Sequence, residues 1–204
     1  MFVLTVDQRS SRRDVDRVEG LLADMALRPL LRAFERTAGD EVQAVSDDPD
    51  TVVTVALELV QRGCWHVGVG IGPVEEPLPE TTRAGRGRAF EIARVAVTRS
   101  KNTLAGVAVE GVDTDAAHDA EAAMTLLGLL ISRRTQEGHE AVAEMVKGRT
   151  QSEAAARLGI SKQAVSHRLA TAGWQAERPG RLLAARLLSR ADERKPEEFL
   201  KGRP

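Results

Sequence analysis

Hydrophobic positions along residues 1–131 follow two different periods. Alternation in Trp65–Ile71 is typical of a strand, whereas apolar residues three and four apart between Val53 and Val60 are typical of a helix. We therefore expect strands at residues 2–6, 33–38, 41–45, 65–71 and 104–109, and helices at about residues 14–27, 48–62, 89–97 and 116–131. Their order predicts an α+β fold, in which the first six elements, βαββαβ, form a ferredoxin-like split βαβ sheet with helices on one face.

A different pattern follows in the last third of the chain. Thr150 and Glu153 have the spacing of a capping box at a helix start. Gly159 suits a sharp turn with positive φ, and Ser161 is a favoured N-cap for a next helix. Two short helices joined by a tight turn that contains glycine predict a helix-turn-helix, whose second helix fits the major groove of DNA.

The second helix of this motif has two unlike faces. Val165 and Leu169 share the face that packs inward, and the opposite face is polar. We expect Gln163 to read a base edge and Arg168 to contact phosphate. The motif resembles the helix-turn-helix of the sigma-factor and LuxR-like superfamily. The alternative is a plain helical hairpin that serves in dimerisation or as a core element. The candidate DNA-binding residues are Thr150, Gln151, Ser161, Lys162, Gln163, Ser166, His167 and Arg168.

The chain after the motif predicts one more helix. We expect Trp174 to close the small core of the helix-turn-helix domain. Pro179 with Gly180 is expected to introduce the last helix. Its leucines are Leu182, Leu183, Leu187 and Leu188. These patterns divide the chain into an α/β domain at residues 1–132 and an all-α helix-turn-helix domain at residues 133–204.

One helix-turn-helix reads few base pairs, whereas a dimer matches a two-fold operator, so we expect a homodimer. Its interface is either the N-terminal domain or the leucine helix, and core packing is the alternative role of those leucines.

The charge of the chain is distributed unevenly. From Arg133 onward there are 15 Lys and Arg against 9 Asp and Glu, a net of +6, and the preceding part has 14 against 21, a net of −7. An acidic domain joined to a basic one fits a sensor or scaffold attached to a nucleic-acid reader, with double-stranded DNA as partner.

Three further features indicate the cytoplasm. The single cysteine, Cys64, excludes an internal disulfide, and charged residues from Asp7 interrupt any signal-peptide run. The apolar run at residues 126–131 is too short to span a bilayer, so no membrane partner is expected.

Two aspartates lie at corners that a split βαβ sheet brings together. Asp7 ends the first predicted strand, and Asp40 lies at the predicted hairpin corner after Gly39. Converging carboxylates are suited to Mg²⁺ with a nucleotide phosphate, because this cation takes oxygen ligands. Aspartate is also common in turns, where it hydrogen-bonds its own backbone.

Several stretches resemble the class III nucleotide cyclase fold and, more closely, the SatD family, which joins a similar domain to a C-terminal helix-turn-helix. The matching stretches are residues 5–7, 37–43, 68–72 and 87–90, together with Ala93 and Arg94. The resemblance implies that Asp7 and Asp40 bind metal and that Mg²⁺ with a nucleotide is the cofactor.

The chain departs from the catalytic pattern of that fold. Arg36 stands where the purine-reading lysine would be, and a planar guanidinium is not equivalent to a point charge. Phe90 stands four residues before Arg94, where cyclases have the transition-state asparagine, so turnover is not expected. The candidate nucleotide-binding residues are Arg36, Arg86, Arg88 and Arg94, and a solvated loop is the alternative for those around Gly87.

These observations favour a DNA-binding transcriptional regulator, whose catalytically degenerate cyclase-like domain serves dimerisation and possible nucleotide sensing. The first alternative is a Mg²⁺-dependent, cyclase-like nucleotide-processing enzyme. The second alternative is a scaffold whose C-terminal helices bind another protein.

Overall fold

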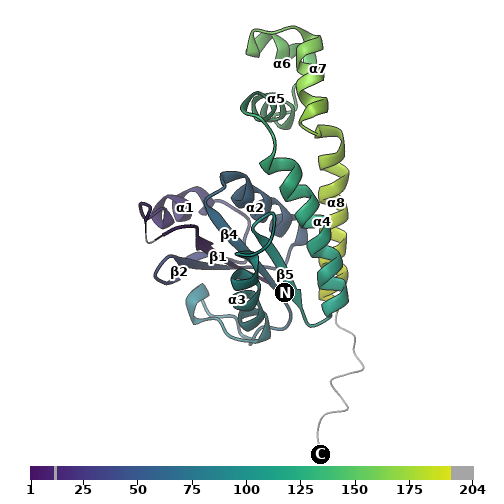
Figure 1. The fold of residues 1–204 in the computed structure, drawn as a ribbon. Coiled ribbons are helices and arrows are strands. Elements are labelled where there is room, and N and C mark those ends of the chain that lie inside the picture. Colours follow the sequence, from purple (N-terminus) through teal and green to yellow (C-terminus); the bar gives the residue numbers. More distant parts are fainter. Residues whose placement is uncertain (12, 194–204) are drawn as a thin grey trace, which may run out of the picture.

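The computed structural model describes residues 1–11 and 13–193 and contains a mixed five-stranded sheet (Figure 1). The strands lie in the order β2-β3-β1-β4-β5; neighbours among the first four are antiparallel, and β5 runs parallel to β4. The strands are β1 (Phe2–Gln8), β2 (Arg32–Ala38), β3 (Glu41–Ser46), β4 (Trp65–Ile71) and β5 (Val107–Gly111). Because β3 lies between β1 and β2, the predicted split connection is present and the sheet is compatible with a ferredoxin-like arrangement.

Eight α-helices and one 3-10 helix complete the described part of the chain. Those of the sheet region are α1 (Val18–Met25), α2 (Pro49–Arg62), η1 (Thr82–Ala84), α3 (Arg88–Ser100) and α4 (Thr114–Ser132). They are followed by α5 (Gln136–Val146), α6 (Gln151–Leu158), α7 (Lys162–Thr171) and α8 (Trp174–Asp192). Within residues 1–11 and 13–193, none of the helices combines the length and apolar character needed to cross a membrane.

The first helix starts later than predicted, at Val18. Gln8 holds the preceding loop, because its side-chain amide donates to the Val15 carbonyl at 2.7 Å and accepts from the Arg17 N–H at 2.9 Å. Leu27, at the end of the helix predicted over residues 14–27, is 97 % exposed. That prediction was wrong because the helix has already ended before Leu27.

Helices cover both faces of the sheet. On β1, the alternate residues Phe2, Leu4 and Val6 point into the core formed with α1, α2 and α4. Val3 points the other way and packs with Phe90 of α3. The helices of the first six elements therefore share one face, as predicted, and α3 covers the opposite face.

Two glycines of β4 bring α3 close to the sheet. A Cβ added at Gly68 would stand 2.1 Å from the Val97 backbone nitrogen, and one at Gly70 would stand 2.3 Å from the Ala89 carbonyl oxygen. Glycines inside a strand allow a ligand or another backbone to approach closely, and the structure places the backbone of α3 there.

Helix α8 starts earlier than predicted and packs elsewhere. It begins at Trp174, directly after Gly173 with a φ of 68°, and Pro179 lies inside it. It then runs beside α4 toward the sheet (Figure 1), where Ala184 and Leu188 enter the sheet core. A Cβ added at Gly180 would stand 2.8 Å from Leu127, so this small residue permits the close helix contact. Helix α8, which belongs to the second predicted domain (residues 133–204), therefore contributes to the core of the first (residues 1–132).

Candidate nucleic-acid interface and ligand pocket

Both short helices of the motif begin, and the first one ends, where the sequence predicts. The Thr150 hydroxyl accepts from the Glu153 N–H at 3.3 Å, and the Glu153 carboxylate accepts from the Thr150 N–H at 2.8 Å. Gly159 ends α6 with a φ of 67°, and the Ser161 hydroxyl accepts from the Ala164 N–H at 3.1 Å. Because that φ is unfavourable for residues with a Cβ, the glycine defines the turn between the helices.

A third helix, α5, completes this region and was not predicted. Its N-cap Thr135 accepts from the Gly138 N–H at 3.2 Å, and apolar residues follow at helical spacing. The cap and that spacing were the signal in the sequence. Trp174 packs against the small core, as predicted. The buried members of this core are Ala141, Val142, Ala154, Ala155, Val165, Leu169 and Ala172.

Helix α7 lies at one end of the molecule (Figure 1), and polar side chains on one of its faces are exposed to solvent. Four candidate DNA-binding residues are exposed on it, namely Lys162, Gln163, Ser166 and His167. Ser161 is exposed at its start. A polar helix face with donors and acceptors of this kind is what direct reading of base edges requires.

The remaining three candidates lie differently. Arg168 is on the side of α7 toward α5, with its Nη1 atom 3.7 Å from Glu140 Oε2. The Thr150 hydroxyl and N–H both hydrogen-bond with Glu153, and Gln151 is half-buried at the start of α6. The geometry thus favours the α7 face over these three positions.

A cationic cluster that the sequence did not indicate surrounds Glu144. This carboxylate is almost fully buried and accepts from Lys147 at 2.9 Å and Arg149 at 2.6 Å, with Arg157 at 3.2 Å. The hydrogen bond from Lys147 is the main cause that lowers the pKa of Glu144, and the two arginines add to it. Three cations on one anion leave a positive excess at the turn between α5 and α6.

A buried ion pair joins the helix-turn-helix to the stalk formed by α4 and α8. Arg134 donates to the Glu177 carboxylate at 2.6 Å and to the Ala172 carbonyl at 3.0 Å, and Arg181 donates to Glu177 at 2.8 Å. The Arg134 and Glu177 side chains are 2 % and 6 % exposed. Burial alone raises the pKa of Glu177, but the hydrogen bond from Arg134 and the charge of Arg181 outweigh it and leave the pKa below its usual value.

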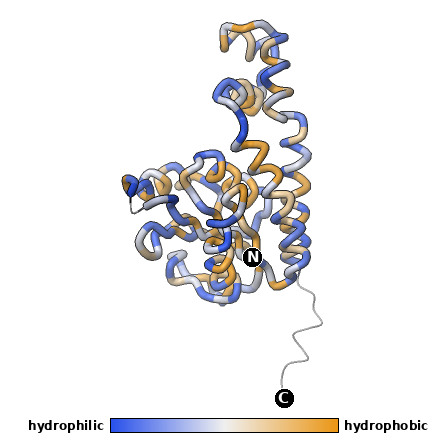
Figure 2. The backbone as a smooth tube through the Cα atoms, in the orientation of Figure 1, coloured by the Kyte–Doolittle hydropathy of each residue, from blue (hydrophilic) through white to orange (hydrophobic). Residues whose placement is uncertain are grey.

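The sheet region also contacts α5 directly, through Gln61 Nε2 of α2 and His139 Nδ1 at 3.2 Å. Burial, and secondarily the charge of Arg134, lower the pKa of His139. The connection between α4 and α5 is hydrophilic in contrast to the apolar segments of the sheet region (Figure 2). This contact and the Arg134–Glu177 pair are thus polar links between the helix-turn-helix and the rest of the molecule.

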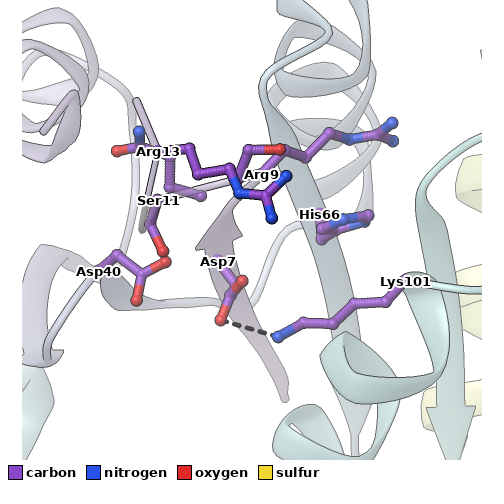
Figure 3. Close-up of a pocket in the computed structure, with 9 residues that line it drawn as sticks. Asp7, Arg9, Ser11, Arg13, Asp40, His66 and Lys101 are labelled. Carbon is purple, nitrogen blue, oxygen red and sulfur yellow. Dashed lines mark ion pairs between the residues drawn. The ribbon is translucent and has the colours of Figure 1, made fainter. Parts of the chain in front are cut away.

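The two predicted metal-binding carboxylates, Asp7 and Asp40, line one open pocket of about 560 Å³ (Figure 3). They come from the end of β1 and from the corner between β2 and β3. Asp7 Oδ2 is 3.1 Å from Lys101 Nζ, at the end of α3. The predicted proximity of the two corners is confirmed, and the sequence did not indicate the lysine beside them.

Two arginines and a histidine also line this pocket. Arg9 is held rigidly, because its Nε donates to the Trp65 carbonyl at 3.0 Å and its guanidinium fits against Gly106, which has no Cβ. Arg13 is exposed, and its guanidinium has no partner among the described residues. His66 Nδ1 is buried without a hydrogen-bond partner in the described chain; burial, followed by the charge of Arg9, lowers the pKa of His66.

The four predicted nucleotide-binding arginines lie outside this pocket. Arg36 is 2.6 Å from Asp16, and Arg88 is 2.9 Å from Glu91. Arg86 and Arg94 are exposed. The structure therefore does not bring these arginines together with Asp7 and Asp40.

No three His, Cys, Asp or Glu side chains in the described ranges form a group that could hold a metal ion. Comparison of the chain with family models, with curated proteins and with solved structures gave no match.

Proposed function

We propose that this chain is a cytoplasmic, DNA-binding transcriptional regulator that reads duplex DNA with α7. The observation that carries the proposal is the open polar face of α7, held in a capped helix-turn-helix by Thr150, Gly159 and Ser161. In a helix-turn-helix, side chains at this place reach base edges while neighbouring groups contact phosphates.

Shape and charge support the same function. The stalk of α4 and α8 holds α6 and α7 away from the sheet (Figure 1), so a duplex can approach α7. Lys147 and Arg157, beside Glu144, have side chains 56 % and 60 % exposed, which suits contacts with the DNA backbone. Because Arg168 pairs with Glu140, Lys162 is the better candidate for a phosphate contact within α7.

We assign the sheet region a cyclase-like, ferredoxin-like fold that senses a small ligand rather than turning it over. The strand order and the antiparallel pairing of β1 to β4 support this assignment. Phe90 supports the lack of turnover, because it is buried against Val3 and Val45 and offers no hydrogen-bond donor.

The proposed regulator acts as a homodimer, which matches a two-fold operator. The leucines of α8 divide between two environments: Leu188 is buried, whereas Leu182 and Leu183 are 53 % and 46 % exposed. Leu126, on the adjoining helix α4, is 70 % exposed. These exposed leucines are the surface we assign to the second copy, and sedimentation showing a monomer at tens of micromolar with and without DNA would contradict it.

The test is a selection from genomic duplexes with the full-length protein, followed by anisotropy titrations over a salt series. We expect Gln163→Ala to change the binding free energy that distinguishes the bases at one base pair by about 1–3 kcal/mol. Lys162→Gln should weaken binding to all DNA sequences alike. It should also reduce by about one the slope of the logarithm of the binding constant against the logarithm of the salt concentration. Arg190→Gln, an exposed charge at the far end of α8, is the matched control. Absence of salt-dependent binding to any duplex would overturn the regulator proposal.

A further inference from the structure

The pocket at the end of β1 already contains a cation beside Asp7. Lys101 caps the C-terminal end of α3, and its ammonium lies 3.1 Å from the Asp7 carboxylate (Figure 3). The resemblance to cyclases assigns Asp7 to a divalent metal, so the lysine and the metal compete for the same carboxylate. An ammonium group supplies donors and positive charge but cannot share a coordination shell with a metal ion.

Positive side chains outnumber the carboxylates of this pocket among the described residues. Arg9, Arg13 and Lys101 line the pocket together with Asp7 and Asp40. A divalent cation entering here meets three like charges, whereas an anion meets a net positive site. The donor set therefore does not fit Mg²⁺.

The available donors fit a phosphate group. The Arg13 guanidinium is exposed and unpaired in the described chain, and Figure 3 shows it directed over the end of β1 near Asp7. Ser11 also lines the pocket, and Figure 3 shows it beside Asp40. Guanidinium and ammonium groups form charge-assisted hydrogen bonds with phosphate oxygens, and the fork of arginine can contact two of them. Arg9 adds positive charge to the wall of the pocket, where its Nε donates to the Trp65 carbonyl.

We propose that this pocket binds a phosphate-bearing small molecule without a divalent metal, with Lys101 supplying the positive charge that Mg²⁺ supplies in cyclases. Arg13 and Lys101 hold the phosphate, and Asp40 is left to accept from a hydroxyl or amino group of the ligand. The inference rests on the sensing part of the proposed function and is independent of DNA binding.

The experiment is calorimetric titration of the full-length protein with inorganic tripolyphosphate, without DNA, once in EDTA and once in excess MgCl₂. We expect binding in EDTA and no strengthening by Mg²⁺. Arg13→Gln and Lys101→Gln should each weaken binding at least tenfold, and Lys101→Arg should retain it because the positive charge stays. Thermal melts of the unliganded variants establish that each is folded.

Two matched controls separate this pocket from other cationic surfaces. Arg94→Gln removes an exposed charge of α3 that does not line the pocket, and Lys162→Gln removes one from the DNA-reading face. Both should bind tripolyphosphate as the unaltered protein does. The proposal is overturned by binding that requires Mg²⁺, by equal losses in the control variants, or by no binding in either buffer. Each of these results leaves the DNA titrations unaffected, so the two proposals fail separately.

Discussion

The helix-turn-helix and the sheet region bury very different side chains. Four of the seven buried residues in the helix-turn-helix core are alanines, whereas the sheet core includes Trp65, Phe2 and many leucines and valines. Since hydrophobic stabilisation scales with the apolar area buried, at about 25 cal/mol per Å², the small core contributes much less. The helix-turn-helix therefore depends on caps, ion pairs and its attachment to the stalk, and the sheet region depends on close packing.

The largest expected effect comes from removing one partner of the buried ion pair at the stalk. Glu177→Ala leaves the Arg134 guanidinium buried beside no carboxylate, and we expect a loss of about 3–5 kcal/mol in the free energy of unfolding. Urea denaturation of the full-length protein, followed by circular dichroism, measures it.

Two variants test the cause of that loss. Glu91→Ala breaks an exposed ion pair with Arg88 and should change stability by less than about 1 kcal/mol. Replacing Arg134 and Glu177 together by methionine should recover most of the loss, because no charge is then buried alone. A small effect of Glu177→Ala would show that the joint between the two regions does not rely on this pair.

A smaller effect, of about 1–3 kcal/mol, is expected for Gly68→Ala in the sheet region. The added methyl group would stand 2.1 Å from the Val97 nitrogen, so β4 and α3 must separate. Gly20→Ala is the matched control, because no atom lies within 4 Å of its added Cβ. In the helix α1, that change should stabilise the protein by roughly 0.5–1 kcal/mol. Equal effects of the two substitutions in urea titrations would contradict the packing described for α3.

The smallest expected effect is a dependence of stability on pH between about 7.5 and 5.5 at the contact of the two regions. The pKa of His139 is lowered from its usual 6.5 in the folded protein, so the unfolded chain binds the proton more readily. The stability due to neutral His139 is therefore complete above pH 6.5 and decreases as the pH falls below it. Protonation also removes the acceptor for Gln61.

Urea titrations at pH 7.5 and 5.5 measure this dependence, with an NMR titration of the imidazole. His139→Gln should reduce the difference in stability between the two pH values. His167→Gln, on the exposed face of α7, should leave that difference unchanged. A pH dependence that is the same in His139→Gln and the unaltered protein would exclude this contact as its source.

Local signals in the sequence determined most of the strands and several helix ends, whereas α1 starts later and α8 earlier than predicted. The caps at Thr150 and Ser161 and the turn at Gly159 occur as predicted, and Trp65–Ile71 is a strand. Each depends on groups within a few residues of one another, so no distant part of the chain is needed to specify it. The proximity of Asp7 and Asp40 could also be predicted from the sequence, because the split order of strands brings their corners together.

Only the tertiary structure decided which surfaces meet. The leucine pattern of α8 shows an apolar face but not its partner, and that face packs on α4 and α2 rather than on the helix-turn-helix. The sequence shows Arg168 and Lys101 only as charged residues and does not show their partners. In the structure Arg168 pairs with Glu140, and Lys101 pairs with Asp7. Such pairs depend on how whole helices are placed, and placement follows from the complementarity of distant surfaces, which local periodicity does not encode.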